Sequence, residues 1–99
     1  MPLDWDKVVM RYAEQPYLTT KEGKVQRVAE VTETALIIDL PGGRQYVRRK
    51  NLEYAVALIE SGRKIRTVSD YRQMVEDDRP TYAWAILRDF GYIVEWCLE

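Results

Sequence analysis

The basic side chains of this sequence are concentrated in one segment, and their types suit contact with phosphate. Between residues 44 and 66 the chain carries seven basic residues against two acidic ones. Arginine, which dominates this set, grips phosphate oxygens through paired hydrogen bonds. Tyr46 and Tyr54 flank the first basic cluster, where their rings could stack on bases. The segment therefore predicts either a nucleic-acid contact or an ordinary solvated surface. The predicted phosphate contacts are Arg48, Arg49, Lys50, Arg63, Lys64 and Arg66.

The chain offers little for catalysis. It has no histidine, which removes the commonest general base and metal ligand. Cys97 is the sole cysteine and has no cationic neighbour in sequence, so a buried structural thiol is expected. A Glu-Gly-Lys unit at 22–24 resembles the Glu-x-Lys units of metal-dependent nucleases, but it falls in a predicted turn. The acidic run at 76–78 lacks the spacing of a cation-binding loop. We expect no enzymatic activity, no cofactor and no metal.

Length and composition predict one folded domain of the α+β class. The chain has 99 residues, of which 46% are hydrophobic and 31% charged. No apolar run approaches the roughly 20 residues of a membrane helix, and the first six residues are acidic where a signal peptide would be basic. A single cysteine suits a reducing compartment. A cytoplasmic protein without membrane contact is expected.

The first half of the chain predicts a helix followed by an antiparallel meander. Apolar residues at helical spacing indicate a helix over 4–14, which Pro16 ends. Turn signals about every ten residues then separate strands over 17–21, 24–31, 34–40 and 44–49, of which three or four form the sheet. In the second strand Val25 shares its face with Ala29 and Val31, and this face is expected to be buried while Val28 points away.

The register of the last hairpin has two solutions. A two-residue Gly42-Gly43 turn, favoured because its twist matches the flanking strands, sets Ile38 opposite Val47. With Pro41-Gly42 at the centre instead, Asp39 meets Arg44.

Three helices and a strand are expected after the meander. Asn51 is the expected N-cap of a helix bearing Leu52 to Ile59, with Gly62 just beyond its end. A helix over 67–75 begins with a Thr67–Asp70 capping box, and Pro80 opens a fourth helix. Residues 92–98 are apolar on both faces of a predicted strand, which must pair within the domain or across a homodimer.

The end of the chain resembles winged helix-turn-helix DNA-binding domains over residues 67–96. Two helices joined by a short turn lead into Phe90-Gly91-Tyr92-Ile93, which holds the place of the Leu-Gly-Ile-like step before the first wing strand. The resemblance implies that the fourth helix reads DNA. The chain departs from the pattern in that Arg88 is the only cation of that helix, the preceding turn is acidic and no residues are left for a second wing strand.

Trp84 and Arg88 are i, i+4 neighbours on the fourth helix, away from its main apolar stripe. They predict a partner contact, since tryptophan and arginine anchor interfaces. The alternative is that Trp84 packs inside the domain.

The sequence as a whole leaves two candidate functions open. The first is a small non-catalytic nucleic-acid-binding or nucleic-acid-associated regulatory protein. The second is a protein–protein adaptor or small inhibitor, encoded for instance by a mobile element, without nucleic-acid affinity.

Overall fold

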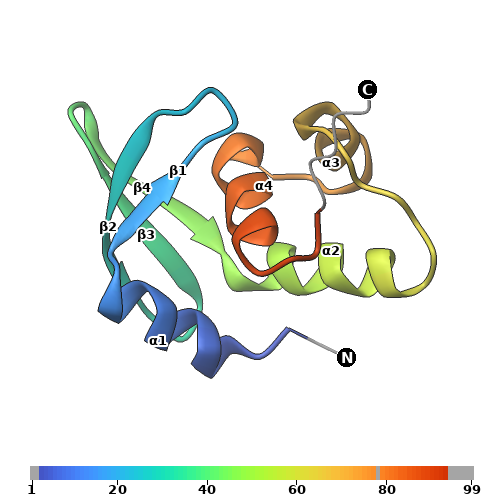
Figure 1. Cartoon of the computed structure of the whole chain (residues 1–99), viewed down its shortest axis with the longest axis horizontal. Coiled ribbons are helices and arrows are strands. Elements are labelled where there is room, and N and C mark those ends of the chain that lie inside the picture. Colours follow the sequence, from blue (N-terminus) through green and yellow to red (C-terminus); the bar gives the residue numbers. More distant parts are fainter. Residues whose placement is uncertain (1–2, 78, 94–99) are drawn as a thin grey trace.

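The computed structural model describes residues 3–77 and 79–93 and has the predicted α+β class (Figure 1). A helix precedes four strands, and three helices follow them. The elements in chain order are α1 (Trp5–Glu14), β1 (Tyr17–Thr19), β2 (Val25–Val31), β3 (Ala35–Leu40), β4 (Gly43–Arg48), α2 (Arg49–Glu60), α3 (Val68–Met74) and α4 (Pro80–Asp89).

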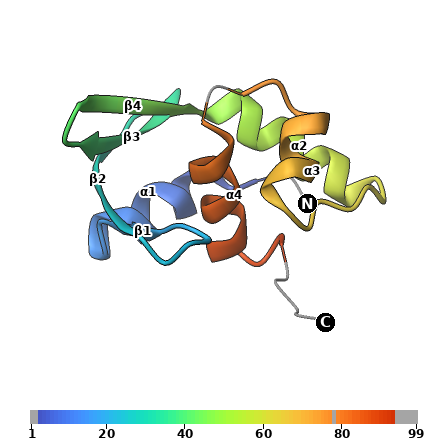
Figure 2. The ribbon, with the colours of Figure 1, turned by 90° about the horizontal axis from the view of Figure 1, so that it is seen from above.

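The four strands form one antiparallel sheet in the order β1-β2-β3-β4, as the meander predicted. β1 and β4 are therefore its edges. The strand predicted over 92–98 falls mostly on residues 94–98, which lie outside the described residues, while Tyr92 and Ile93 belong to no strand. Figure 2 shows α4 between the sheet and the pair formed by α2 and α3.

The register favoured for the β3–β4 hairpin is wrong. Leu40 pairs with Gly43, which places Pro41 and Gly42 at the turn centre. Asp39 consequently lies opposite Arg44, and its carboxylate binds Arg44 Nε at 3.2 Å. The fixed φ of proline suits the first central position of a turn. Gly43 follows with φ of 131°, a backbone conformation that glycine alone adopts without strain.

The face predicted for β2 is wrong at its first half, and a β-bulge explains the error. Val25 is 60% exposed whereas Val28 is buried. The pairing shifts between Val28 and Glu30, so Ala29 is an extra residue in the ladder. Because a bulge adds one residue to one strand, it exchanges the faces on either side of itself. A strict two-residue alternation therefore fails here.

The signals that predicted where α1, α3 and α4 begin are confirmed. Asp4 accepts a hydrogen bond from the Asp6 backbone N–H at 3.1 Å at the start of α1. Thr67 and Asp70 form the reciprocal capping box of α3, with distances of 3.0 and 3.3 Å. Pro80 occupies the first turn of α4, where its missing donor costs nothing.

The predicted start of α2 is wrong by three residues. The helix begins at Arg49, directly after β4, with Arg48 as an N-cap that makes no side-chain capping bond. Asn51 is thus inside the first turn and does not cap it. At the other end Ser61 is the C-cap and Gly62 has φ of 105°, as its predicted position after the helix requires.

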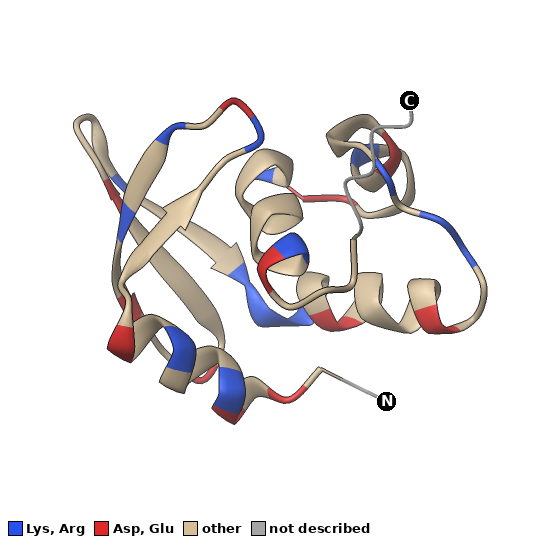
Figure 3. Ribbon diagram, in the orientation of Figure 1, with Lys and Arg blue, Asp and Glu red and all other residues tan. Residues whose placement is uncertain are grey.

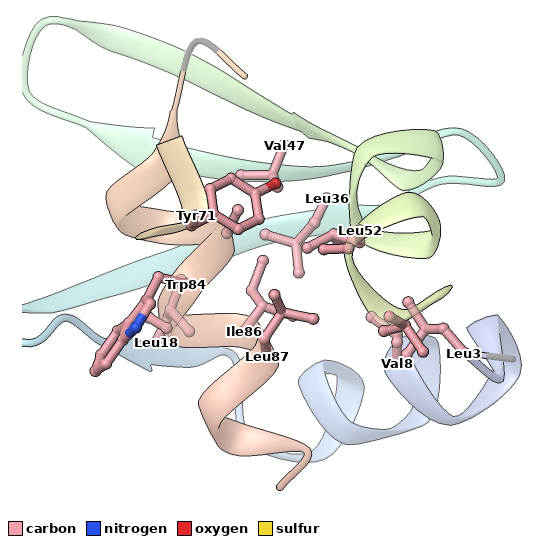
Figure 4. Packing of buried hydrophobic residues seen from close by; sticks show 14 of the residues in the cluster. Leu3, Val8, Leu18, Leu36, Val47, Leu52, Tyr71, Trp84, Ile86 and Leu87 are labelled. Atoms are coloured by element: carbon pink, nitrogen blue, oxygen red, sulfur yellow. The ribbon is translucent and has the colours of Figure 1, made fainter. Parts of the chain in front are cut away.

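The core lies between the inner face of the sheet and the helices (Figure 4). Leu36 and Ile38 of β3 are fully buried, as are Ile86 and Leu87 of α4. α1 closes one side of the core, where the Trp5 indole N–H donates to the Thr32 carbonyl at 2.7 Å. The consequence is that α4 has neighbours on all sides, since every residue from 83 to 87 is buried.

Candidate functional site

The two basic clusters of the sequence lie at opposite ends of α2. Figure 3 shows basic residues where β4 passes into α2 and again in the connection that follows α2. The helix has 12 residues, which corresponds to a length of about 18 Å. Arg63, Lys64 and Arg66 are exposed at the far end. The structure therefore does not bring the two clusters into one site.

A hollow with a volume of about 570 Å³ lies beside the first cluster, and we refer to it as the β4–α2 hollow. It is formed by β4, the first turns of α2 and the connection between α3 and α4. Its lining residues are Gln45, Tyr46, Arg48, Lys50, Asn51, Tyr54, Val75, Glu76, Asp77 and Arg79. This volume is within the range of sites that bind small organic ligands.

The helical geometry of α2 determines which of its side chains line the hollow. Tyr54 follows Lys50 by four residues and Asn51 by three, so each of these two shares a helix face with Tyr54. Because α2 begins at Arg49, Asn51 is not used as a cap and its side chain lines the hollow. The sequence prediction that Asn51 caps the helix concealed this role.

The β4 side of the hollow combines residues from both faces of an edge strand. Gln45 belongs to the inner face, whereas Tyr46 and Arg48 alternate with it and belong to the outer face. A hollow lined from both faces opens along the free edge of the strand. As the edge of the described sheet, β4 offers backbone donors and acceptors there.

Two exposed tyrosines give the hollow its aromatic character. The exposed fractions are 53% for Tyr46 and 54% for Tyr54. Arg48 and Lys50, beside them, are also exposed. The structure therefore joins aromatic rings and cations at the place where the sequence predicted bases and phosphates to bind.

The third wall of the hollow is fixed by hydrogen bonds around Asp77. Its carboxylate accepts from the Tyr71 hydroxyl at 2.7 Å and from the Arg79 backbone N–H at 2.8 Å. Arg79 Nε donates to Gln45 Oε1 and so links this wall to β4. Burial raises the pKa of Tyr71, and the hydrogen bond to Asp77 raises it further. The wall is thus attached both to the core and to the sheet.

Arg49 makes three contacts within the fold. Its Nε donates to Glu53 at 3.0 Å, one terminal nitrogen donates to the Glu33 carbonyl at 3.0 Å, and the guanidinium lies 5.3 Å from the Trp5 ring centroid. It does not line the β4–α2 hollow. Arg49 therefore anchors the start of α2, although the sequence grouped it with its neighbours.

The surface position predicted for Trp84 is wrong, and the alternative of internal packing is correct. The side chain is fully buried, and its indole N–H donates to the Arg66 carbonyl at 3.2 Å. The Arg88 guanidinium lies 4.9 Å and the Lys21 ammonium 5.6 Å from the ring centroid. Arg88 also donates to the Thr19 carbonyl at 2.6 Å, so it joins α4 to β1.

Sequence reasoning missed Arg79 and Gln45 as residues of the site. They are 34 positions apart and meet only when the α3–α4 connection lies against β4. No local pattern marks either residue. Only the arrangement of elements brings them to the hollow.

Asp39, on β3, is an acidic side chain that the fold uses for ion pairing. Asp39 is bound by Arg27 at 3.1 Å and by Arg44 at 3.2 Å. Among residues 3–77 and 79–93, no three His, Cys, Asp or Glu side chains are grouped as a metal site. Within the same residues, no helix has both the length and the apolar character needed to cross a bilayer.

Comparisons with known proteins bring no further identification. No protein-family model, curated protein or solved structure matches this chain.

Proposed function

We propose that this protein is a small, non-catalytic nucleic-acid-binding protein that acts in regulation and contacts its ligand through the β4–α2 hollow. The observation that carries the proposal is the meeting of Tyr46 and Tyr54 with Arg48 and Lys50 around one hollow. A cytoplasmic location belongs to the same proposal, since a lone cysteine suits a reducing compartment.

Each group of side chains in the hollow matches a part of a nucleotide. The tyrosine rings offer flat apolar faces for bases. Arg48 and Lys50 supply positive charge for phosphates. The Asn51 amide carries both a donor and an acceptor for the edge of a base, and Gln45, whose oxygen accepts from Arg79, still offers its amide N–H groups.

We do not assign DNA reading to α4, although the winged-helix resemblance implies it. Residues 83–87 of this helix are all buried, so its middle has no face to insert into a groove. Arg88 is held by Thr19 and by the Trp84 ring. The proposal therefore rests on the hollow, and not on the resemblance.

The test is binding to labelled mixed-sequence oligonucleotides at low salt, followed by fluorescence anisotropy. The double variant Arg48→Ala/Lys50→Ala should weaken binding and reduce the slope of log affinity against log salt by about 1.4 to 1.8, the value for two phosphate contacts. The matched control is Arg63→Ala/Lys64→Ala, which removes the same charge from the far end of α2. Absence of binding, or an equal loss in the control, would refute the proposal.

A protein partner is the second candidate, favoured by exposed apolar residues on α1. Met10 is 62% and Val9 37% exposed. The tryptophans give this candidate less support, because Trp5 and Trp84 are buried and Trp96 lies outside the described residues. If oligonucleotides fail to bind, a Met10→Lys variant that loses a partner captured by the wild type would support it.

The predicted homodimer stays a prediction. It depends on the apolar tail, most of which lies outside the described residues. Light scattering at low micromolar concentration distinguishes the monomer from the dimer.

A further inference from the structure

We infer that the β4–α2 hollow receives an unpaired base, so that the protein binds single strands in preference to duplex. This inference rests on the proposed function and specifies the form of the nucleic acid. It is drawn from the shape of the site, the position of its charges and the burial of the helix that would otherwise read a groove.

The shape of the site favours an unpaired base. A hollow of about 570 Å³ with aromatic side chains on two of its walls is concave. In a duplex the faces of the bases are stacked on one another, and the surface exposes phosphates, sugars and the edges of the bases in the grooves. Only an unpaired base can offer its face to Tyr46 or Tyr54.

The polar groups of the hollow suit the edge of an unpaired base. Gln45 and Asn51 carry amides on opposite walls, one on β4 and one on α2. β4, an edge strand of the described sheet, adds its backbone to this side of the hollow. Such groups can pair with the Watson–Crick edge of a base only when its complement is absent.

The charges are arranged asymmetrically around the hollow. Arg48 and Lys50 are on the side where β4 joins α2, whereas the wall formed by the α3–α4 connection carries Glu76 and Asp77 together with Arg79, whose Nε donates to Gln45. The first side carries positive charge only and attracts a phosphate backbone, whereas the second has one more acidic than basic side chain and does not attract it. One strand passing along the basic side satisfies both conditions, whereas the wider surface of a duplex would bring a second backbone towards the acidic wall.

Neither α4 nor α2, the helix beside the hollow, has the described residues of a groove reader. The middle of α4 is buried on every side. The exposed residues of α2 are Lys50, Tyr54, Ala57 and Glu60, which include one cation only. Both observations point away from duplex recognition through a helix.

The experiment compares a short labelled strand with the same strand annealed to its complement, using both DNA and RNA. We expect tighter binding to the single strand. Tyr54→Leu, which removes the aromatic face, should weaken this binding about fivefold to a hundredfold, whereas Tyr54→Phe should retain it. Duplex binding should be unchanged by either substitution.

A matched control is available on another strand. Tyr17 is 54% exposed, the same as Tyr54, but it lies on β1 and does not line the hollow. Tyr17→Leu should leave single-strand affinity unchanged. Because both tyrosines are exposed, the variants are expected to fold, which circular dichroism verifies.

The outcomes separate the inference from the proposed function. If duplex binds as tightly as single strands and Tyr54→Leu has no effect, while Arg48→Ala/Lys50→Ala weakens both, the inference is overturned and the proposed function stands. If neither form binds, both fail. A free nucleoside monophosphate is the last arm: affinity equal to that of the strand would show a mononucleotide site and would also overturn the inference.

Discussion

Two buried tyrosines should make the stability of this domain fall at alkaline pH. The hydroxyl of Tyr71 donates to Asp77 and that of Tyr12 donates to Asp89, each at 2.7 Å. Burial is the main reason why the pKa of each tyrosine is raised, and the neighbouring carboxylate adds to it. In the folded protein both hydroxyls therefore stay protonated at a pH where the unfolded chain ionises.

The sign and the size of the effect follow from linkage. Because the folded pKa is raised, the contribution to stability is complete below the unfolded pKa of about 10 and is lost as pH rises above it. Each tyrosine should lower the free energy of unfolding by about 1.4 kcal/mol per pH unit, so the pair lowers it by about 2.7 kcal/mol per unit.

Substitution of Tyr71 by phenylalanine isolates one half of this slope. At neutral pH the variant should be less stable by about 1.5 kcal/mol, because it loses a hydrogen bond to a charged acceptor. Above about pH 10 the wild type loses about 1.4 kcal/mol of stability per pH unit more than the variant does. The curves of unfolding free energy against pH for the two proteins should therefore cross at about pH 11. The difference between the two proteins cancels the titration of all other groups.

The assay is urea denaturation from about pH 7 to about pH 11, the range that covers the ionisation of tyrosine. Tryptophan fluorescence reports unfolding, since Trp5 and Trp84 are buried. Tyr12→Phe provides an independent repeat at the Asp89 contact. Parallel stability curves for wild type and Tyr71→Phe across this range would refute the reasoning, because they would mean that the hydroxyl ionises equally in both states.

Three further substitutions test the packing, the capping and the surface charge, each by urea denaturation at neutral pH. Trp84→Ala should cost about 3 to 5 kcal/mol, since it empties a fully buried site, and a loss below about 1 kcal/mol would contradict that burial. Thr67→Ala removes the side chain that caps α3 and should cost about 1 kcal/mol; an unchanged stability would show that the capping box does not form. Asp39→Ala removes two ion pairs but should cost less than about 1 kcal/mol, because all three partners are more than one-third exposed.

Local sequence patterns were sufficient to predict most of the helices and strands of this fold. The spacing of Trp5, Val8 and Tyr12 predicted α1, and the capping box and Pro80 predicted the starts of α3 and α4. These signals depend on residues within one or two turns of each other. The antiparallel order of the meander followed from its short turns.

The errors arose where distant residues decide the outcome. The bulge at Ala29 depends on the pairing of β2 with β3, and no residue type within β2 predicts it. Trp84 was assigned to the surface because a single buried stripe was expected, whereas α4 is covered on all sides. A helix in that position has no polar face from which burial could be judged.

Only the part of the candidate site that is formed by residues close in sequence could be predicted. Tyr46, Tyr54, Arg48 and Lys50 are close in sequence, so their grouping could be predicted. The wall that completes the hollow comes from the α3–α4 connection, and its link to the sheet is the contact between Arg79 and Gln45. Chain-distant contacts of this kind leave no trace in a single sequence.

The central place of α4 has a consequence for the order in which the chain can fold during synthesis. The sheet is complete at Arg48, but the helix that covers its inner face does not begin until Pro80. At ribosomal speeds of about 5–20 residues per second, Leu36 and Ile38 wait for their partner for about two to six seconds. During that interval the apolar face can be shielded from other nascent chains by α1, which precedes the sheet, and by α2 and α3, which are made before α4.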